Sequence, residues 1–165
     1  MSTTQNLLKA AVDKHQNGQI GEAREIYSQI IATDENAEAL HWLGILELQS
    51  GEPQNALPHL TRASELAPQN AQLLANLGNA CFATQNFDQA TDAYRKSLAI
   101  NPESPETQAN LGNLLLAAND TEQAIVHYEK ALLQNQKLPE IWRSLATALL
   151  SRGQEERALS AIERA

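Results

Sequence analysis

A Leu-Gly pair recurs along the chain at a fixed interval. Leu43-Gly44, Leu77-Gly78 and Leu111-Gly112 follow one another at a spacing of 34 residues. An alanine further along keeps the same step, at Ala56, Ala90, Ala124 and Ala158. A period of about 34 residues with a Leu-Gly pair, a mid-repeat Ala and a late Pro indicates a repeat made of two helices. Such repeats bury their core between neighbours and offer a long concave face for binding.

The register divides residues 1–165, as a single domain, into repeats 4–36, 37–70, 71–104, 105–138 and 139–165, the last incomplete. In the central repeat, apolar residues follow helical spacing at Leu74, Leu77, Cys81 and Phe82. The mid-helix glycines of the Leu-Gly pairs are expected to admit a close second helix, with Ala56, Ala90 and Ala124 as the facing residues.

The turn inside each repeat is also periodic. Gly18, Gly51 and Gly153 share one register position, which Asn119 takes once. Glycine and asparagine tolerate the left-handed conformation that ends many helices. Gln85 holds this position in the central repeat, so a somewhat different turn is expected there.

Composition excludes several classes of function. The net charge is −8, and no basic stripe offsets it, so binding to nucleic acid is not expected. A run of about 18 apolar residues, which a membrane span needs, is missing, and the start of the chain lacks the basic and apolar parts of a signal peptide. We therefore expect a cytoplasmic protein that does not bind membranes.

Residues with catalytic or metal-binding chemistry are scattered. The single cysteine, Cys81, falls on a helix-packing stripe, and the four histidines lie in different repeats without ligand spacing. The sequence has no phosphate-binding glycine loop and no nucleophile motif. We expect no enzymatic activity, no cofactor and no metal site.

Several register positions together resemble the tetratricopeptide repeat family. Repeat 37–70 carries the pattern as Leu40, Leu43-Gly44, Glu47, Gly51, Ala56, Leu60, Ala63 and Pro68. Repeat 71–104 carries it as Leu74, Leu77-Gly78, Cys81, Gln85, Ala90, Tyr94, Ser97 and Pro102. The resemblance implies an all-α fold, a right-handed α-solenoid of about five antiparallel helix pairs with the first helices on the concave side.

The same resemblance points to candidate binding residues on the first helices. Asn76 and Asn110 hold equivalent positions, as do Asn79 and Asn113, and this arrangement is similar to the asparagine ladder of O-linked N-acetylglucosamine transferases. Such amides would pair with the backbone of an extended peptide. Repeat 37–70 would present Glu38, His41, Trp42, Ile45, Leu48 and Gln49, and the last repeat would add Arg143. Two alternatives remain open: the asparagines are simply common in the family, and Trp42 packs against a neighbouring helix.

Three functions are compatible with this pattern. The first is a scaffold that binds a protein or peptide in its concave groove. The second is the substrate-recruiting N-terminal region of a larger glycosyltransferase or sulfotransferase, since bacterial repeat proteins of this kind open similarly. The third is a self-assembling module: the last repeat stops within its second helix, and its apolar residues Ala158, Leu159 and Ile162 would support a homodimer through an uncapped face.

Overall fold

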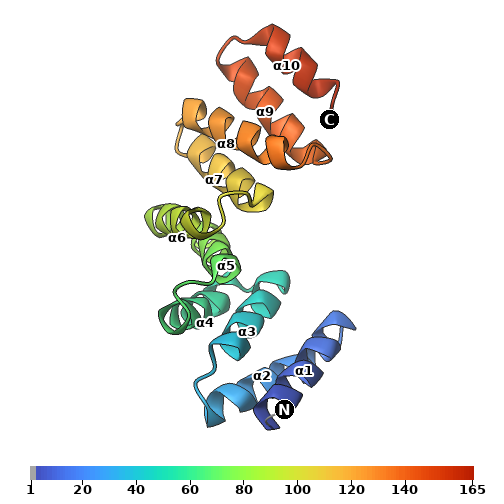
Figure 1. Ribbon diagram of the computed structural model, residues 1–165, viewed down its shortest axis with the longest axis vertical. Coiled ribbons are helices and arrows are strands. Elements are labelled where there is room, and N and C mark those ends of the chain that lie inside the picture. Colours follow the sequence, from blue (N-terminus) through green and yellow to red (C-terminus); the bar gives the residue numbers. More distant parts are fainter. Residues whose placement is uncertain (1–2) are drawn as a thin grey trace. The chain divides into compact units, whose positions relative to one another are not determined.

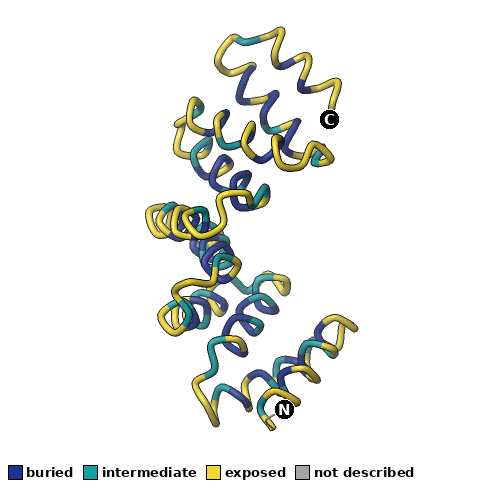
Figure 2. Tube along the Cα trace, in the orientation of Figure 1, coloured by how far each residue is buried: buried dark blue, intermediate teal, exposed yellow. Residues whose placement is uncertain are grey.

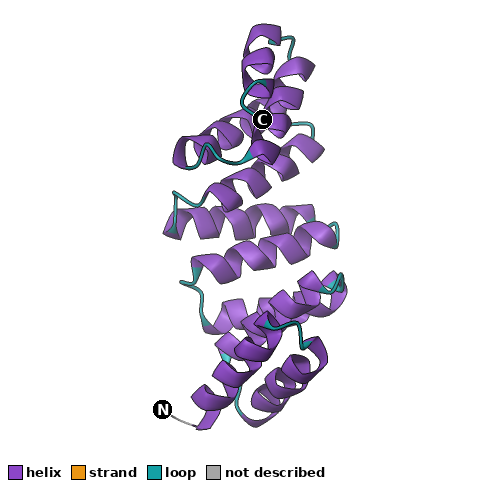
Figure 3. Ribbon diagram, turned by 90° about the vertical axis from the view of Figure 1, so that its right-hand side faces the viewer, coloured by secondary structure: helices purple, strands orange, loops and turns teal. Residues whose placement is uncertain are grey.

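Residues 3–165 are described in the computed structural model, and they form ten α-helices (Figure 1). In chain order these are α1 (Thr3–Gln16), α2 (Ile20–Thr33), α3 (Ala37–Gln49), α4 (Pro53–Leu66), α5 (Ala71–Ala83), α6 (Phe87–Ile100), α7 (Pro105–Ala117), α8 (Thr121–Gln134), α9 (Pro139–Ser151) and α10 (Glu155–Ile162). Only helices and connecting loops occur among these residues (Figure 3). The predicted all-α fold of paired antiparallel helices, about five repeats long, is confirmed.

The starts of the first helices follow from local sequence. Asn36 caps α3 by accepting a hydrogen bond from the Ala39 amide at 2.9 Å, and Asn70 caps α5 through Leu73 at 3.1 Å. Ser104 does the same for α7, where Pro105 occupies the first turn. Proline suits that position because its missing N–H would have no helical partner. Side-chain caps and prolines thus begin these helices at the register positions that the period predicts.

The chain divides into two compact units, Met1–Asn86 and Phe87–Ala165. In unit 1, α1 packs on α2 and α3 on α4, and α5 packs against α4 and α3. In unit 2, α7 packs on α8 and α9 on α10, and α6 packs against α7. Each unit therefore has its own apolar interior, built where helices face one another (Figure 2).

The mid-helix glycines make room for large side chains. A Cβ on Gly44 would lie 2.5 Å from Cγ of Leu60, and one on Gly112 would lie 2.8 Å from Cε1 of Tyr128. Leu60 and Tyr128 are at most 1% exposed. The space left by the missing Cβ is taken by the bulky residue four positions after Ala56 and Ala124, the alanines predicted to face these glycines.

The residue at the turn position has the same left-handed backbone conformation in all five repeats. The backbone φ is 76° at Gly18, 75° at Gly51, 71° at Gly153, 64° at Asn119 and 63° at Gln85. The predicted left-handed conformation is confirmed for the glycines and for Asn119. The expectation of a different turn at Gln85 is wrong, because this residue adopts the same conformation despite its side chain.

Glu47 is a buried carboxylate at the register position that Cys81 and Leu115 hold in the next two repeats. Glu47 is 4% exposed. Its Oε2 lies 2.9 Å from Nδ1 of His59, and its Oε1 lies 3.7 Å from Nη1 of Arg24. Arg24 also reaches Glu52 at 2.9 Å. The buried carboxylate is thus compensated by polar partners from α2 and α4.

Candidate functional site: the inner wall of the first helices

In unit 1 the first helices α1, α3 and α5 contact one another in sequence. Their adjacent side chains form a surface that we call the inner wall of unit 1, made of His15, His41, Trp42, Gln49 and Asn76. In unit 2, α7 and α9 contact each other in the same manner. The predicted binding residues lie on these helices.

Polar side chains of the inner wall bond across neighbouring first helices. His15 Nε2 on α1 lies 2.8 Å from Oε1 of Gln49 on α3. Asn76 Nδ2 on α5 donates to Nε2 of His41 on α3 at 2.9 Å. Because an amide nitrogen only donates, His41 accepts through an unprotonated Nε2. These contacts fix the amide and imidazole groups in position before any partner arrives.

Burial favours the neutral form of His41. Its side chain is 9% exposed, and desolvation lowers its pKa from 6.5 to about 4. The imidazole therefore carries no charge at neutral pH. His41, one of the predicted site residues, serves as an acceptor for Asn76 rather than as a cation.

Trp42 combines packing with partial exposure. Its ring meets the His15 ring nearly edge-on, with centroids 6.1 Å apart and planes at 82°, and lies 6.4 Å from the ring of His41. It packs against the core cluster of unit 1 while staying partly accessible. Packing against a neighbouring helix and a binding role, which the sequence left as alternatives, are therefore compatible.

A pocket of about 340 Å³ opens beside Trp42. It is formed by the start of α3, the segment between α4 and α5, and the start of α5. Its lining consists of Ala37, Glu38, His41, Trp42, Ala67, Asn70 and Leu73. The volume lies at the lower end of the range for small-molecule pockets.

In unit 2 the predicted residues are placed differently. Tyr128 Oη on α8 donates to Oδ1 of the exposed Asn113 at 2.8 Å. Burial raises the pKa of Tyr128 to about 12, so this donor keeps its proton. Arg143 on α9 is exposed and pairs with Glu140 one turn earlier. Asn110 on α7 is partly buried.

The structure brings His41, Trp42 and Asn76 together in unit 1, where Asn79 lies on α5 as well. Sequence reasoning did not connect His15 to this wall. A signal for it was present, because His15 and Gln49 are 34 residues apart, one full period. Residues separated by one period lie on adjacent first helices, where long side chains reach one another.

Metal clusters and membrane-spanning helices are both missing from the part of the chain that the structure describes. Within residues 3–165, no cluster of three or more His, Cys, Asp or Glu side chains is arranged to hold a metal ion. Over the same residues, none of the helices combines the length and the apolar character needed to cross a bilayer.

The paired helices, left-handed turns and bonded inner wall define a helical-hairpin repeat protein. Models described as tetratricopeptide repeat match residues 8–71, 47–114, 85–137 and 115–165. The chain therefore belongs to the tetratricopeptide repeat family, whose domains typically bind other proteins and typically have no catalytic activity. No curated protein matches the sequence.

Solved structures share the fold at low sequence identity. A crystal structure of MamA superposes with a TM-score of 0.87 at 23% identity, covering 93% of this chain and 91% of that one. PilF of Pseudomonas aeruginosa gives a TM-score of 0.87 at 20% identity, over 98% of this chain and 74% of that one. A MamA RS-1 variant gives 0.89 at 16% identity, over 99% and 93%. These likenesses show the fold alone.

Proposed function

We propose that the chain is a protein-binding scaffold that holds an extended peptide along the inner wall of unit 1. The observation that carries this proposal is the line of polar side chains that bond across adjacent first helices in unit 1, next to a pocket beside Trp42. A surface that already fixes its hydrogen-bonding groups loses less side-chain entropy on binding.

The amides supply the chemistry that an extended backbone requires. An asparagine side chain has two donors and one carbonyl acceptor, and the bond to His41 uses one donor of Asn76. Asn110 holds the equivalent position on α7 of unit 2. This recognition depends on the peptide backbone and therefore tolerates many sequences.

The test is a selection from a displayed library of random nonapeptides, followed by affinity measurements with the full chain. Each hydrogen bond contributes about 0.5–1.5 kcal/mol, so Asn76→Ala should weaken a selected peptide roughly 2- to 13-fold. The matched control, Gln54→Ala, removes an exposed amide from a second helix of unit 1 and should leave affinity unchanged. Failure of any peptide to enrich, or equal effects of the two variants, would refute the proposal.

A second candidate is self-association through the last helix pair. Leu150, Leu159 and Ile162 are 52%, 59% and 52% exposed. Ile162 holds the register of Leu60 and Tyr128, which are nearly inaccessible because α5 and α9 pack against their helices. A helix of a second copy would cover the α9–α10 face in the same way.

Sedimentation velocity over a concentration series tests this second candidate. The unaltered chain should form dimers as concentration rises, and Leu159→Glu should abolish them. The matched control is Val126→Glu, which places the same charge at a residue of α8 that is 38% exposed. A chain that stays monomeric throughout would contradict self-association.

A further inference from the structure

The charge of the pocket beside Trp42 comes from a single carboxylate. Of the side chains that line it, Glu38 alone carries a formal charge at neutral pH, since desolvation keeps the neighbouring His41 neutral. Lysine and arginine are missing from the lining. The pocket is thus negative at its rim and otherwise apolar or uncharged.

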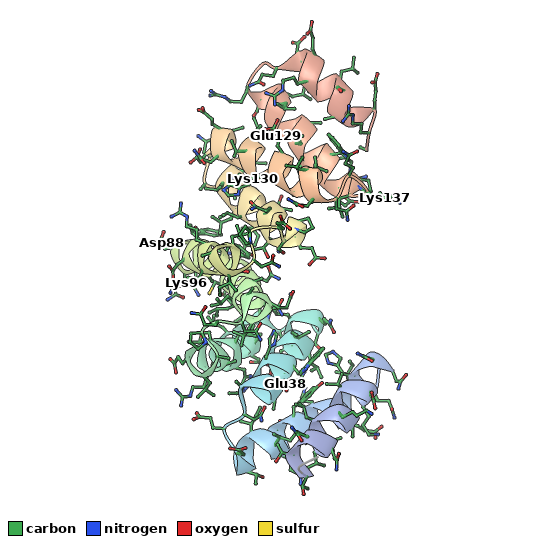
Figure 4. The ribbon with its side chains drawn as sticks, in the orientation of Figure 1. Glu38, Asp88, Lys96, Glu129, Lys130 and Lys137 are labelled. Atoms are coloured by element: carbon green, nitrogen blue, oxygen red, sulfur yellow. The ribbon has the colours of Figure 1, made fainter. Side chains whose placement is uncertain are left out.

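Three other carboxylates of unit 1 are paired with basic side chains, whereas Glu38 lacks such a partner among the described residues. Glu35 is held by Arg62, Glu52 by Arg24 and Glu22 by Lys14. Glu38 is exposed and has no basic nitrogen within 4.0 Å among the residues that the structure describes. Figure 4 labels Glu38 in unit 1. Its charge is therefore available to a ligand.

Trp42 follows Glu38 by one helical turn. Residues four apart lie on the same side of a helix, so the carboxylate and the indole ring border the same space. A cation close to an indole face gains an additional electrostatic attraction. Carboxylate and indole together favour a positively charged group with an apolar stem.

We propose that this pocket binds the side chain of a lysine or arginine of the bound peptide, an inference that rests on the peptide-binding function proposed above. The ammonium or guanidinium group lies between the Glu38 carboxylate and the Trp42 ring. The methylene stem packs against Ala37, Ala67 and Leu73, which supply apolar lining. The net charge of −8 on the chain also attracts a basic segment.

The helix starts at this pocket do not favour an anion instead. The N-termini of α3 and α5 carry partial positive charge, but Asn36 and Asn70 already cap them through the Ala39 and Leu73 amides. Glu38 adds a full negative charge in the first turn of α3. An acidic side chain entering the pocket would meet that charge directly.

The experiment is an NMR titration of the full chain with four acetylated and amidated nonapeptides, Ser-Thr-Ser-Thr-X-Thr-Ser-Thr-Ser, in which X is Arg, Lys, Gln or Glu. The indole N–H resonance of Trp42 reports on the pocket, and Trp142→Phe identifies it. The Arg and Lys peptides should bind at least about 5-fold more tightly than the Gln peptide, and the Glu peptide should bind most weakly.

Glu38→Gln should reduce the preference for Arg over Gln to less than about 2-fold, because it removes the charge and keeps the shape. The matched control is Glu106→Gln, at the same repeat position on α7, where the residue one turn later is Asn110 instead of Trp42. This control should preserve the preference. Glu38 is exposed, so its substitution leaves the fold intact.

Three results would overturn the inference: equal binding of the Arg and Gln peptides, equal effects of Glu38→Gln and Glu106→Gln, or an unmoved Trp42 resonance while Asn76 resonances shift. In each of these the peptide still binds, so the proposed function stands. If no peptide moves any resonance of the inner wall and library selection also fails, the proposed function falls together with the inference.

Discussion

The space at Gly112 provides a sharp test of how these helix pairs pack. Gly112→Ala should destabilise unit 2, although alanine is the better helix former. A Cβ at this position would lie 2.8 Å and 2.9 Å from two ring atoms of Tyr128. The ring has little freedom to move away, because Tyr128 is 1% exposed and its hydroxyl is bonded to Asn113.

The magnitude follows from two opposing effects. Replacing a mid-helix glycine by alanine gains up to about 1 kcal/mol of helix propensity. Overpacking an apolar core costs about 1–3 kcal/mol. Both ring atoms fall short of the 3.4 Å at which ordinary contact begins by about 0.5 Å or more, which favours the upper half of that range. We expect a net loss of about 1–2 kcal/mol, a fall in melting temperature of roughly 4–15 °C for a unit of this size.

Thermal and urea unfolding, followed by circular dichroism and by Trp142 fluorescence in a Trp42→Phe background, measure this loss. Gly21→Ala is the matched control, because a Cβ there meets nothing within 4 Å, and it should be neutral or stabilising. In a Tyr128→Ala background, Gly112→Ala should no longer destabilise. Stabilisation by Gly112→Ala alone, or an equal effect in both backgrounds, would show that the ring does not require the glycine.

Three further predictions concern the turns, the buried carboxylate and pH. Gln85→Gly should raise the unfolding free energy by about 1 kcal/mol, because a φ of 63° is costly for glutamine. Gly51→Ala, at a φ of 75°, should lower the unfolding free energy. A lower unfolding free energy in both variants would contradict this reasoning. His59→Ala should cost about 1–3 kcal/mol in urea unfolding by removing the 2.9 Å partner of buried Glu47; an unchanged midpoint would show that the contact contributes nothing. The folded-state pKa of His41 is lowered to about 4, so the unfolded chain binds the proton first, and stability should fall by up to about 3 kcal/mol as pH drops from 6.5 to 4. His41→Gln should flatten that pH profile, which unfolding curves at successive pH values would reveal.

The helix pairs and turns were predictable because they repeat. One period fixes the Leu-Gly pair and the following turn, and each feature acts on the backbone locally. Gln85 shows how strongly the period constrains the turn. The packing on both sides of the turn imposes the left-handed conformation on a residue that does not favour it.

Contacts between neighbouring helices were less predictable because they depend on side-chain length and helix offset. His15 bonds Gln49 at a separation of 34 residues, whereas His41 bonds Asn76 at a separation of 35. A period alone gives equivalent positions and does not say which neighbour a side chain reaches. The same limit applies to Leu60, whose side chain lies nearest to Gly44: the register predicts where space is left, and side-chain volume decides which residue fills it.

Glu47 shows how a departure from the repeat pattern becomes a link between repeats. An isolated carboxylate at a core position would be strongly unfavourable, so its tolerance depends on partners. Those partners come from both sides: His59 belongs to the same repeat, and Arg24 lies on α2 of the preceding one. Arg24 also pairs with Glu52, which directly precedes α4. Loss of α2 would therefore leave Glu47 short of a counter-charge, which ties the stability of the second helix pair to the presence of the first.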